Sequence, residues 1–530
     1  MFDIKTKNIK AKIWVYLMIA CSLISLAGCA LQNVNGLSSE TENTGEEMAS
    51  LGLTPEFNYK VPDSLPAILV DQVGYAAASS KIAVFRGEIL PDTYNIVSVD
   101  TGETVYLGEI EEKGYDSVTN EAISYGDFTE FTEEGTYYLQ AEYVGQSYSF
   151  MIEKNPYTEI FKEAMKQYYY NRCGSNLSRE LAGEAAHNAC HMRTAQLKED
   201  ATVQLDVSGG WHVDESGKRD VAEGCQAAAA LLLAYELYGE IFSDDVGIPE
   251  SGNEIPDVMD EIRYEIEWLL KMQDTASGAV YSGISVIDNG TSSNLLCAED
   301  ITMEATIEFA AAMAKFSYLY QNYDRKFATK CLQAADRAYR YAGKYLNDVS
   351  PEAYFFAAAE LYRASGNYNY RNAVLSYLSG TENPDMSNDS VFYGAVTYLS
   401  TKQRVDVEQC DRLIGILLSD VEEISYASKN SRYLTEGNEK QDNNDELLGK
   451  MARLVVVDHI ITNHEYTTVL ENHLHYFLGR NAYAVSYIEN AGGRSYQLID
   501  EKAGIMKQVD LNAELILLMS AIEEELMVTG

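Results

Sequence analysis

The chain has 530 residues, enough to bury a large core and to form more than one domain. It carries 40 Lys and Arg against 81 Asp and Glu, which gives a formal net charge of −41. This balance excludes nucleic acid and acidic polymers as ligands, because phosphate contacts need clustered cations. A neutral ligand is the easiest partner to accommodate, and the 39 Tyr supply flat amphipathic surfaces that suit sugar faces.

The N-terminus has the pattern of a lipoprotein export signal. Lysines precede an apolar run from Ile13 to Leu26, which is shorter than the roughly 18 to 20 residues that span a bilayer. A pair of small residues then stands directly before Cys29, and polar sequence follows. We predict a signal peptide over residues 1–28, lipidation of Cys29 and a polar linker over residues 29–66. The protein would then be exported and anchored by lipid to the bacterial cell membrane, facing outward.

Residues 67–154 have the pattern of a β-sandwich. Short runs rich in β-branched residues and Tyr, such as Lys81–Phe85, Tyr94–Val99 and Gly135–Ala141, recur at a spacing of roughly 10 residues. Gly and Asp turns separate them. Short, evenly spaced strands of this kind are typical of a sandwich of two sheets.

From residue 155 to residue 530 the periodicity is helical. Roughly a dozen helices in one block favour a toroid of helix pairs over a four-helix bundle. The clearest segments are Tyr157–Tyr170, Val221–Tyr238, Pro256–Met272, Thr306–Tyr320, Lys326–Tyr345, Glu352–Ala364, Glu446–Ile461, Tyr466–Phe477 and Leu511–Leu526.

Several strings, taken in order, resemble the family 9 glycoside hydrolases that carry an N-terminal immunoglobulin-like module. The resemblance covers almost everything after residue 68 and implies an immunoglobulin-like β-sandwich followed by an (α/α)6 barrel of the six-hairpin glycosidase type. It also implies a cleft that hydrolyses β-1,4-glucan with inversion. The strings are Val70-Asp71-Gln72-Val73-Gly74-Tyr75, Tyr168-Tyr169-Tyr170-Asn171-Arg172-Cys173-Gly174, His187-Asn188-Ala189-Cys190-His191, Asp206-Val207-Ser208-Gly209-Gly210-Trp211-His212, Ile255-Pro256-Asp257-Val258-Met259-Asp260-Glu261, Trp268-Leu269-Leu270-Lys271-Met272-Gln273, Ala357-Ala358-Ala359-Glu360-Leu361-Tyr362 and Tyr476-Phe477-Leu478-Gly479-Arg480-Asn481.

The motif that supplies the catalytic base in this family departs from the family pattern. The family has two Asp residues, three apart, between Gly-Gly-Trp and a Gly-Lys pair, and this chain is one residue shorter there. If Gly217-Lys218 keeps the register, Val213 and Ser216 occupy the two Asp positions. If the gap lies elsewhere, Asp214 supplies one carboxylate and Glu215 approximates the other. The alternative is a solvated acidic loop.

The catalytic acid position is also changed. In the family a Glu precedes a Trp-Asn-Ala run, which Leu511-Asn512-Ala513 resembles, and counting back places Met506 at the position of that Glu. A thioether cannot donate a proton to a leaving group. Glu501 is the nearest carboxylate upstream and is displaced by five residues. No acid is therefore identified, and Trp211 and Arg494 are the expected substrate contacts.

A metal site is expected at Cys173, Cys190, His191 and His212. Two thiolates and two imidazoles are a usual composition for tetrahedral structural zinc. Family members with the immunoglobulin-like module resemble this chain in having zinc ligands in these segments, so the resemblance implies zinc here. His187 is a possible substitute ligand, and buried thiols beside surface histidines are the alternative. The sequence does not decide whether calcium binds.

The four other cysteines of the exported chain lie in apolar stretches. Cys225, Cys297, Cys331 and Cys410 fit best as small buried side chains, and disulfides among them stay open.

Three functions are compatible with these features. The first is a surface lipoprotein that binds β-glucan or an oligosaccharide in a vestigial cleft. The second is an active inverting hydrolase of the endoglucanase type that uses Asp214 or Glu215 with a displaced acid. The third is a structural scaffold of a surface complex. Fold resemblance alone does not separate them, because function depends on the site.

Overall fold

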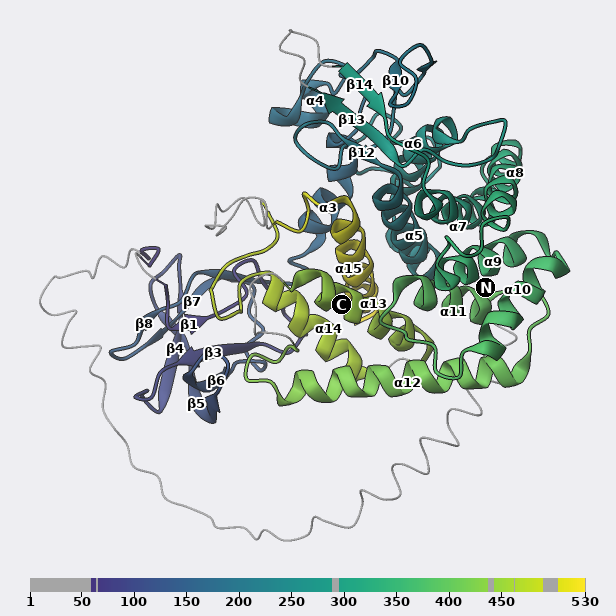
Figure 1. Cartoon of the computed structure of the whole chain (residues 1–530). Coiled ribbons are helices and arrows are strands. Elements are labelled where there is room, and N and C mark those ends of the chain that lie inside the picture. Colours follow the sequence, from purple (N-terminus) through teal and green to yellow (C-terminus); the bar gives the residue numbers. More distant parts are fainter. Residues whose placement is uncertain are drawn as a thin grey trace, which may run out of the picture.

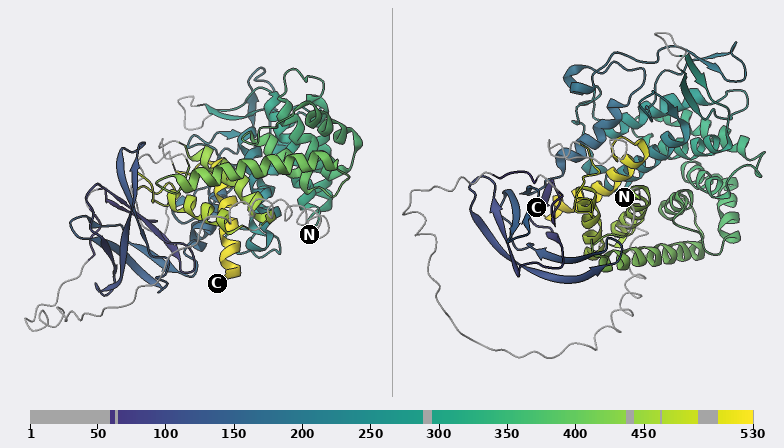
Figure 2. Two further views of the ribbon diagram at one scale, coloured as in Figure 1. Left: turned by 90° about the horizontal axis from the view of Figure 1, so that it is seen from below. Right: turned by 60° about the vertical axis from the view of Figure 1, so that its left-hand side comes forward.

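The computed structural model describes residues 59–62, 65–287, 295–436, 443–461, 463–489 and 504–529. A β-sandwich lies at one side of a larger helical body in every view (Figures 1 and 2). Among the described residues, no helix has the length and apolarity needed to cross a bilayer. The predicted signal peptide, Cys29 and residues 30–58 of the predicted linker lie outside the described residues.

The N-terminal body is a sandwich of two sheets that share one long strand. That strand, β5 (Thr104–Asp116), pairs with β6 on one side and with β4 on the other. Tyr75, Phe85, Tyr94 and Phe150 fill the space between the sheets. The remaining strands are β1 (Ile68–Leu69), β2 (Gly74–Ala76), β3 (Ile82–Arg86), β4 (Thr93–Ser98), β6 (Glu121–Asp127), β7 (Gly135–Ala141), β8 (Gly145–Gln146) and β9 (Phe150–Glu153).

The string from Val70 to Tyr75, at the start of the sandwich, forms the joint to the helical body. The carboxylate of Asp71 accepts hydrogen bonds from the backbone N–H groups of Val73 and Gly74, and its second oxygen lies 2.8 Å from Nδ1 of His475. Gln72 donates its backbone N–H to the carbonyl of Leu478. Burial raises the pKa of Asp71 and lowers the pKa of His475, so both groups favour their neutral forms.

The helical body is a closed ring of six helices covered by an outer layer. Each inner helix packs against the next, and the last returns to the first. The inner helices are α5 (Val221–Tyr238), α7 (Met303–Tyr320), α9 (Pro351–Ser365), α11 (Asp389–Ser400), α13 (Asn444–Ile461) and α15 (Val509–Thr529). The outer helices are α3 (Thr158–Tyr170), α6 (Asp257–Met272), α8 (Arg325–Ala342), α10 (Tyr368–Gly380), α12 (Val407–Asn430) and α14 (His464–Phe477). This is the predicted (α/α)6 barrel.

Sequence periodicity located most helices because their apolar faces are broad. The bounds of α5 agree with the prediction at both ends, since Asp220 caps its start by accepting hydrogen bonds from Ala222 and Glu223. The helix predicted over Lys326–Tyr345 ends at Ala342 instead, because the chain turns at Gly343. Helices α10, α11 and α12 were not among the predicted segments.

A second, five-stranded sheet lies beside α6, at the top of Figure 1. Its strands are β10 (Ala195–Leu197), β11 (Gln204–Leu205), β12 (Arg219–Asp220), β13 (Gly283–Ile287) and β14 (Leu295–Ala298). β10 pairs in parallel with β14, about a hundred residues later in the chain. Short segments α4 (Arg179–Ala182), η1 (Gly183–Ala185) and η2 (Gly239–Ile241) complete the described elements.

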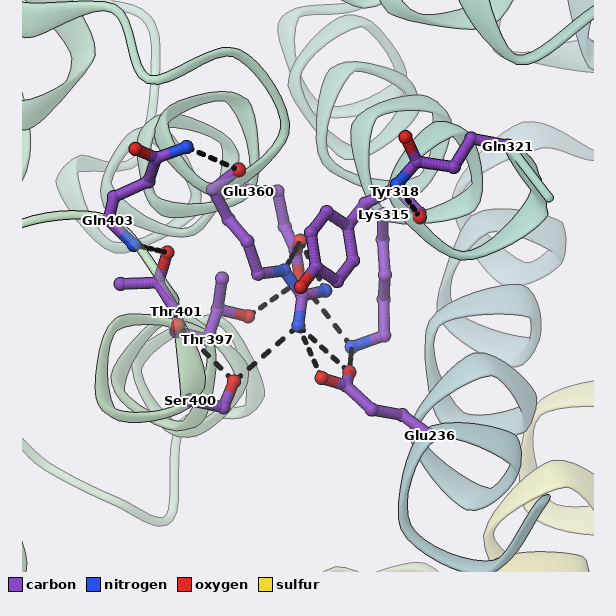
Figure 3. Close-up of polar contacts among 10 residues, drawn as sticks. Glu236, Lys315, Tyr318, Gln321, Glu360, Thr397, Ser400, Thr401 and Gln403 are labelled. Carbon is purple, nitrogen blue, oxygen red and sulfur yellow. Dashed lines mark hydrogen bonds and ion pairs between the residues drawn. The ribbon is translucent and has the colours of Figure 1, made fainter. Parts of the chain in front are cut away.

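A buried ion network joins the C-terminal halves of the inner helices (Figure 3). Arg363 of α9 pairs with Glu236 of α5 and with Glu360, each at 2.7 Å. Lys315 of α7 lies 3.4 Å from Glu360 and 3.5 Å from Glu236. Thr397 of α11 donates a further hydrogen bond to Glu360 at 2.6 Å. Two carboxylates thus face two cations, and four helices are tied together.

Candidate functional site

The loop that was expected to carry the base is a tight turn. Val213 donates its backbone N–H to the carbonyl of Lys218, and Gly217 donates to the carbonyl of Asp214. One oxygen of the Asp214 carboxylate accepts from the N–H of Ser216 at 2.8 Å, from its hydroxyl at 2.6 Å and from the N–H of Lys218 at 3.2 Å. Partial burial acts in the opposite direction, but these hydrogen bonds lower the pKa of Asp214. Asp214 is ionised and closes its own turn.

Glu215 and Trp211 do not complete a base site in this arrangement. The side chain of Glu215 is exposed. The indole of Trp211 is 1% exposed and packs on Tyr168, with ring centroids 4.5 Å apart. The expectation that Trp211 contacts a glycan is therefore corrected, because its ring lies in the core. Its backbone N–H donates to buried Glu265 at 2.7 Å, and burial raises the pKa of Glu265 to about 8.

The expected acid position is closed to solvent. Met506 is 1% exposed, and its backbone N–H donates to Oε2 of Glu489 at 3.1 Å. Glu489 is itself 8% exposed, and burial raises its pKa. Its other oxygen lies so near Gly504 that a Cβ there would come within 1.6 Å. Glu489 therefore anchors the backbone before α15 and is not a group that faces a cleft.

Two expected residues cannot be placed. Arg494, the second expected substrate contact, and Glu501, the nearest upstream carboxylate, both lie outside the described residues.

The barrel has a cavity of about 500 Å³ at the N-terminal ends of its inner helices. Helices α5, α7, α9, α11, α13 and α15 all contribute to its wall. Six of the side chains that line it are carboxylates: Glu308, Asp389, Asp445, Glu446, Asp510 and Glu514. Sequence reasoning missed this group. Asp389, Asp445 and Asp510 each stand in the first turn of a helix, where an acidic residue is usual for the helix dipole, so nothing local marked them.

The cavity shifts the proton affinity of its carboxyl groups. Burial raises the pKa of Glu308 to about 7, and a hydrogen bond from Ser390 at 3.4 Å acts weakly in the other direction. Burial, followed by the charges of Asp389 and Asp510, raises the pKa of Glu514 well above its ordinary value. Glu308 and Glu514 therefore stay at least partly protonated near neutral pH, which is the state required of a proton donor.

The turn at Asp214 lies within electrostatic reach of this cavity. Glu223 stands in the first turn of α5, one turn before the cavity-lining Gln226. Burial raises the pKa of Glu223, and the charges of Asp510 and Asp214 add to the effect. The loop that carries Asp214 and the cavity are therefore neighbouring parts of one acidic region.

The expected metal ligands converge. The ligand atoms of Cys173, Cys190, His191 and His212 all lie within 4.8 Å of one another. The two sulfur atoms are 4.0 Å apart, Sγ of Cys173 lies 3.7 Å from Nδ1 of His191, and Sγ of Cys190 lies 3.6 Å from Nε2 of His212. Bonds of about 2.3 Å to sulfur and about 2.0 Å to nitrogen give tetrahedral edges of roughly 3.3 to 3.8 Å. The four atoms fit one tetrahedral ion.

The surroundings of the cluster hold this geometry. The N–H of Gly174 donates to Sγ of Cys190 at 3.5 Å, and the hydroxyl of Tyr264 donates to the carbonyl of Cys173 at 2.6 Å. Gly217 lies against the ring of His191, where a Cβ would come 2.3 Å from Cε1. His187 does not belong to the cluster and is hydrogen-bonded to the carbonyl of Asn188.

None of the six cysteines in the described part of the chain forms a disulfide. Cys225, Cys297 and Cys331 are buried. The separation of Cys173 and Cys190 is also far longer than a disulfide bond of about 2.05 Å.

The comparisons with known proteins agree with this architecture. The sequence model described as "Glycosyl hydrolase family 9" matches residues 157–509, and the one described as "Cellulase N-terminal ig-like domain" matches residues 63–146. A cellodextrinase of Butyrivibrio fibrisolvens is 27% identical over 482 residues, which cover 81% of this chain and 86% of the relative. Endoglucanase D of Acetivibrio thermocellus is 28% identical over 463 residues, 80% of this chain and 73% of the relative.

Solved structures have the same fold. A metagenome-derived family 9 endoglucanase is 26% identical with a TM-score of 0.76, and the match covers 86% of this chain and 98% of that one. A Zn-binding triple mutant of the family 9 endoglucanase J30 is 22% identical with a TM-score of 0.74, and the match covers 84% and 99% of the two chains. The predicted resemblance and the predicted fold are confirmed: this chain belongs to glycosyl hydrolase family 9, with an immunoglobulin-like domain before the barrel.

Proposed function

We propose that the barrel binds a β-1,4-linked glucan or oligosaccharide and that the inherited pair of catalytic groups does not hydrolyse it. The observation that carries this proposal is the pair of changes at Asp214 and Met506. Inverting hydrolysis needs two carboxyl groups about 6.5 to 9.5 Å apart, one protonated and one ionised beside a water. One oxygen of Asp214 is occupied by hydrogen bonds that close its own turn, and Met506 is a buried thioether. The names of the cellodextrinase and endoglucanase relatives support a glucan as the ligand class.

The test is a paired assay of hydrolysis and binding. Purified protein is incubated with carboxymethylcellulose, β-glucan and cello-oligosaccharides while reducing ends are counted, and oligosaccharide binding is measured by calorimetry. Saturable binding without release is expected. Release that disappears in Asp214→Ala contradicts the proposal. The matched control is Asp200→Ala, because Asp200 closes an exposed turn on Thr202 with the same pattern of hydrogen bonds.

A second candidate function is hydrolysis by a displaced pair of carboxyl groups in the cavity. The raised pKa of Glu308, about 7, is the observation that favours it, since a proton donor of that pKa works at neutral pH. The ionised partner would be another cavity carboxylate, with Asp214 or Glu215 as the alternative named above. Release of reducing ends that survives in Asp214→Ala but disappears in Glu308→Gln would establish it. If the protein neither binds oligosaccharides nor releases reducing ends, the scaffold role is the function that remains.

We also propose that the ion held by Cys173, Cys190, His191 and His212 is structural zinc. The donor set and the distances support it, and all four positions are taken by protein, so no position is open for a reacting water. The cluster joins the loop that contains Trp211 to the end of α3, so loss of the ion should be a folding defect. Elemental analysis is expected to give one zinc per chain in the natural protein and none in Cys190→Ser. Zinc retained at full occupancy in that variant would contradict the assignment.

The membrane anchor is a separate proposal, which rests on the sequence alone. Acylated Cys29 would hold the body outside the cell on the linker that ends near residue 66. Expression with Cys29→Ser should move the protein from the membrane fraction to the medium or periplasm. Unchanged membrane association would contradict it.

A further inference from the structure

The carboxylates that line the barrel cavity outnumber the cations that line it. Six carboxylates face two cations, Lys450 and Arg453. Lys450 already pairs with Glu446 at 2.7 Å and with Glu436 at 2.8 Å. Arg453 pairs through Nε with Asp420, 2.7 Å away and outside the set of lining residues. After these pairs are made, five carboxyl groups face the cavity with no cation of their own.

Glu514 is one of these five groups. Protein surrounds its side chain on nearly every side, and the surface that remains accessible lines the cavity. Within the described ranges, Glu514 has neither a hydrogen bond nor an ion-pair partner. Its charged neighbours there are Asp389, Asp510 and Asp445, which repel it, and Arg453. A carboxyl group placed in this way costs free energy when it ionises, and a bound cation would offset that cost.

A single metal ion does not fit this arrangement. In the part of the chain that the structure describes, the Cys and His cluster is the only group of three or more possible ligands whose atoms lie within 4.8 Å of one another. No three of the cavity carboxylates form such a group in the described part of the chain. A ligand with several contact points over the wall of the cavity therefore fits the arrangement better than one ion held by three or more of these carboxylates.

The rest of the wall suits a sugar ring. The rings of Phe356 and Tyr393 are stacked, with centroids 5.6 Å apart, and give the cavity an aromatic side. Gln226 adds an amide group that can donate to a sugar hydroxyl, and Ser387 and Ser390 add hydroxyl oxygens that can accept from one. A volume of about 500 Å³ is in the range of small-ligand pockets.

We propose that this cavity binds a saccharide that carries free amino groups, of the glucosamine type, with its ammonium groups among Glu514, Asp389 and the neighbouring carboxylates. The inference rests on the proposed glycan-binding function and narrows its ligand. A β-1,4-linked glucosamine chain has the backbone of a β-1,4-glucan with an amino group in place of one hydroxyl on each ring. The net charge of −41 also favours the approach of such a chain.

The first test compares four ligands on the full-length protein by calorimetry at mildly acidic pH, at which the amines of the glucosamine oligomers are protonated. They are β-1,4-glucosamine oligomers, the same oligomers N-acetylated, cello-oligosaccharides of equal length, and spermidine. We expect the glucosamine oligomers to bind at least tenfold more tightly than the acetylated or cello forms, and added salt to weaken this preference. Equal affinity for cello- and glucosamine oligomers overturns the inference and leaves glucan binding standing. Binding of no sugar overturns both. Spermidine as tight as the glucosamine oligomers shows an amine site that does not select a saccharide, and that result also overturns the inference.

The second test uses charge-removing variants of the same size. Glu514→Gln and Asp389→Asn should each lower the affinity for glucosamine oligomers about tenfold, and more than they lower the affinity for cello-oligosaccharides. Asp389 is exposed at the cavity rim, so its variant should fold even if the substitution at Glu514 perturbs the core. The control is Glu112→Gln, an exposed residue of β5 in the sandwich. Unchanged affinity for glucosamine oligomers in both cavity variants contradicts the proposal.

Discussion

The two ends of the barrel differ in whether their buried charges are paired. At the C-terminal ends of the inner helices, Glu236 and Glu360 face Lys315 and Arg363, and the four charges cancel within one network. At the N-terminal ends, six carboxylates line a cavity. The two cations there, Lys450 and Arg453, already pair with Glu446 and Asp420 and leave the other five without a cation. A balanced network makes the fold specific. An unbalanced set of charges is stable only if some groups stay protonated or if a ligand supplies the missing charge, so it marks the end that binds.

The largest effect is expected from breaking the balanced end. Arg363→Met leaves Glu236 and Glu360 with Lys315 as their only cation in that network, and an uncompensated buried charge costs about 3 to 5 kcal/mol. Thermal and denaturant unfolding followed by circular dichroism would measure the loss. The matched control is Arg340→Met, because Arg340 is 71% exposed in its ion pair with Asp336. A loss in Arg363→Met no larger than in the control would show that the network is not a structural tie.

The carboxyl groups of the cavity should make the free energy of unfolding depend on pH. Burial raises the pKa of Glu308 to about 7 in the folded protein, against 4.5 for the unfolded chain. Between these two pH values the folded protein holds a proton that the unfolded chain has released. The stability that this proton contributes is complete below pH 4.5 and is lost as the pH rises through 7. Glu308→Gln cannot titrate. The free energy of unfolding of the natural protein, relative to the variant, should fall by roughly 3 kcal/mol over that interval.

The control for this comparison is Glu112→Gln in the exposed face of β5, which should run parallel to the natural protein at every pH. Parallel curves for Glu308→Gln and the natural protein would show that Glu308 is not held in its protonated form.

Removal of one cavity carboxylate should have the opposite sign to removal of a charge from the network. Glu514→Gln replaces a carboxyl group that burial and the charges of Asp389 and Asp510 keep from ionising with a neutral group of the same size, so the variant should be as stable as the natural protein or more stable by about 1 kcal/mol at neutral pH. Denaturant unfolding at pH 7 would measure the difference. A loss of several kcal/mol would mean that Glu514 has a structural role like that of Glu360.

The smallest effect is expected at Ser390. Ser390→Ala removes a hydrogen bond to Glu308 that is already long, 3.4 Å. Since this bond lowers the pKa of Glu308, the variant should raise that pKa slightly and change stability by only a few tenths of a kcal/mol. Carboxyl titration by NMR would detect the shift. A fall in the pKa of Glu308 would contradict the hydrogen bond.

The sequence predicted the barrel and the metal cluster better than it predicted the cavity. Helices such as α5 have strong local signals, an N-cap and a long apolar run, and the cluster has residue types that few other roles require. The small sheet was missed because β10 and β14 are short and pair across about a hundred residues. The cavity was missed for a related reason: its carboxylates come from four helices, each acidic residue looks like an ordinary first-turn or surface residue, and only closure of the ring brings them together.

Gly217 links the loop that carries Asp214 to the metal cluster. It sits where the ring of His191 excludes any side chain, only three residues after Asp214, and the same loop carries the metal ligand His212. A residue inserted between His212 and Gly217 would push Gly217 away from the ring of His191. A change of length in the loop that carries Asp214 should therefore disturb the metal cluster as well, so the loop and the cluster can vary only together.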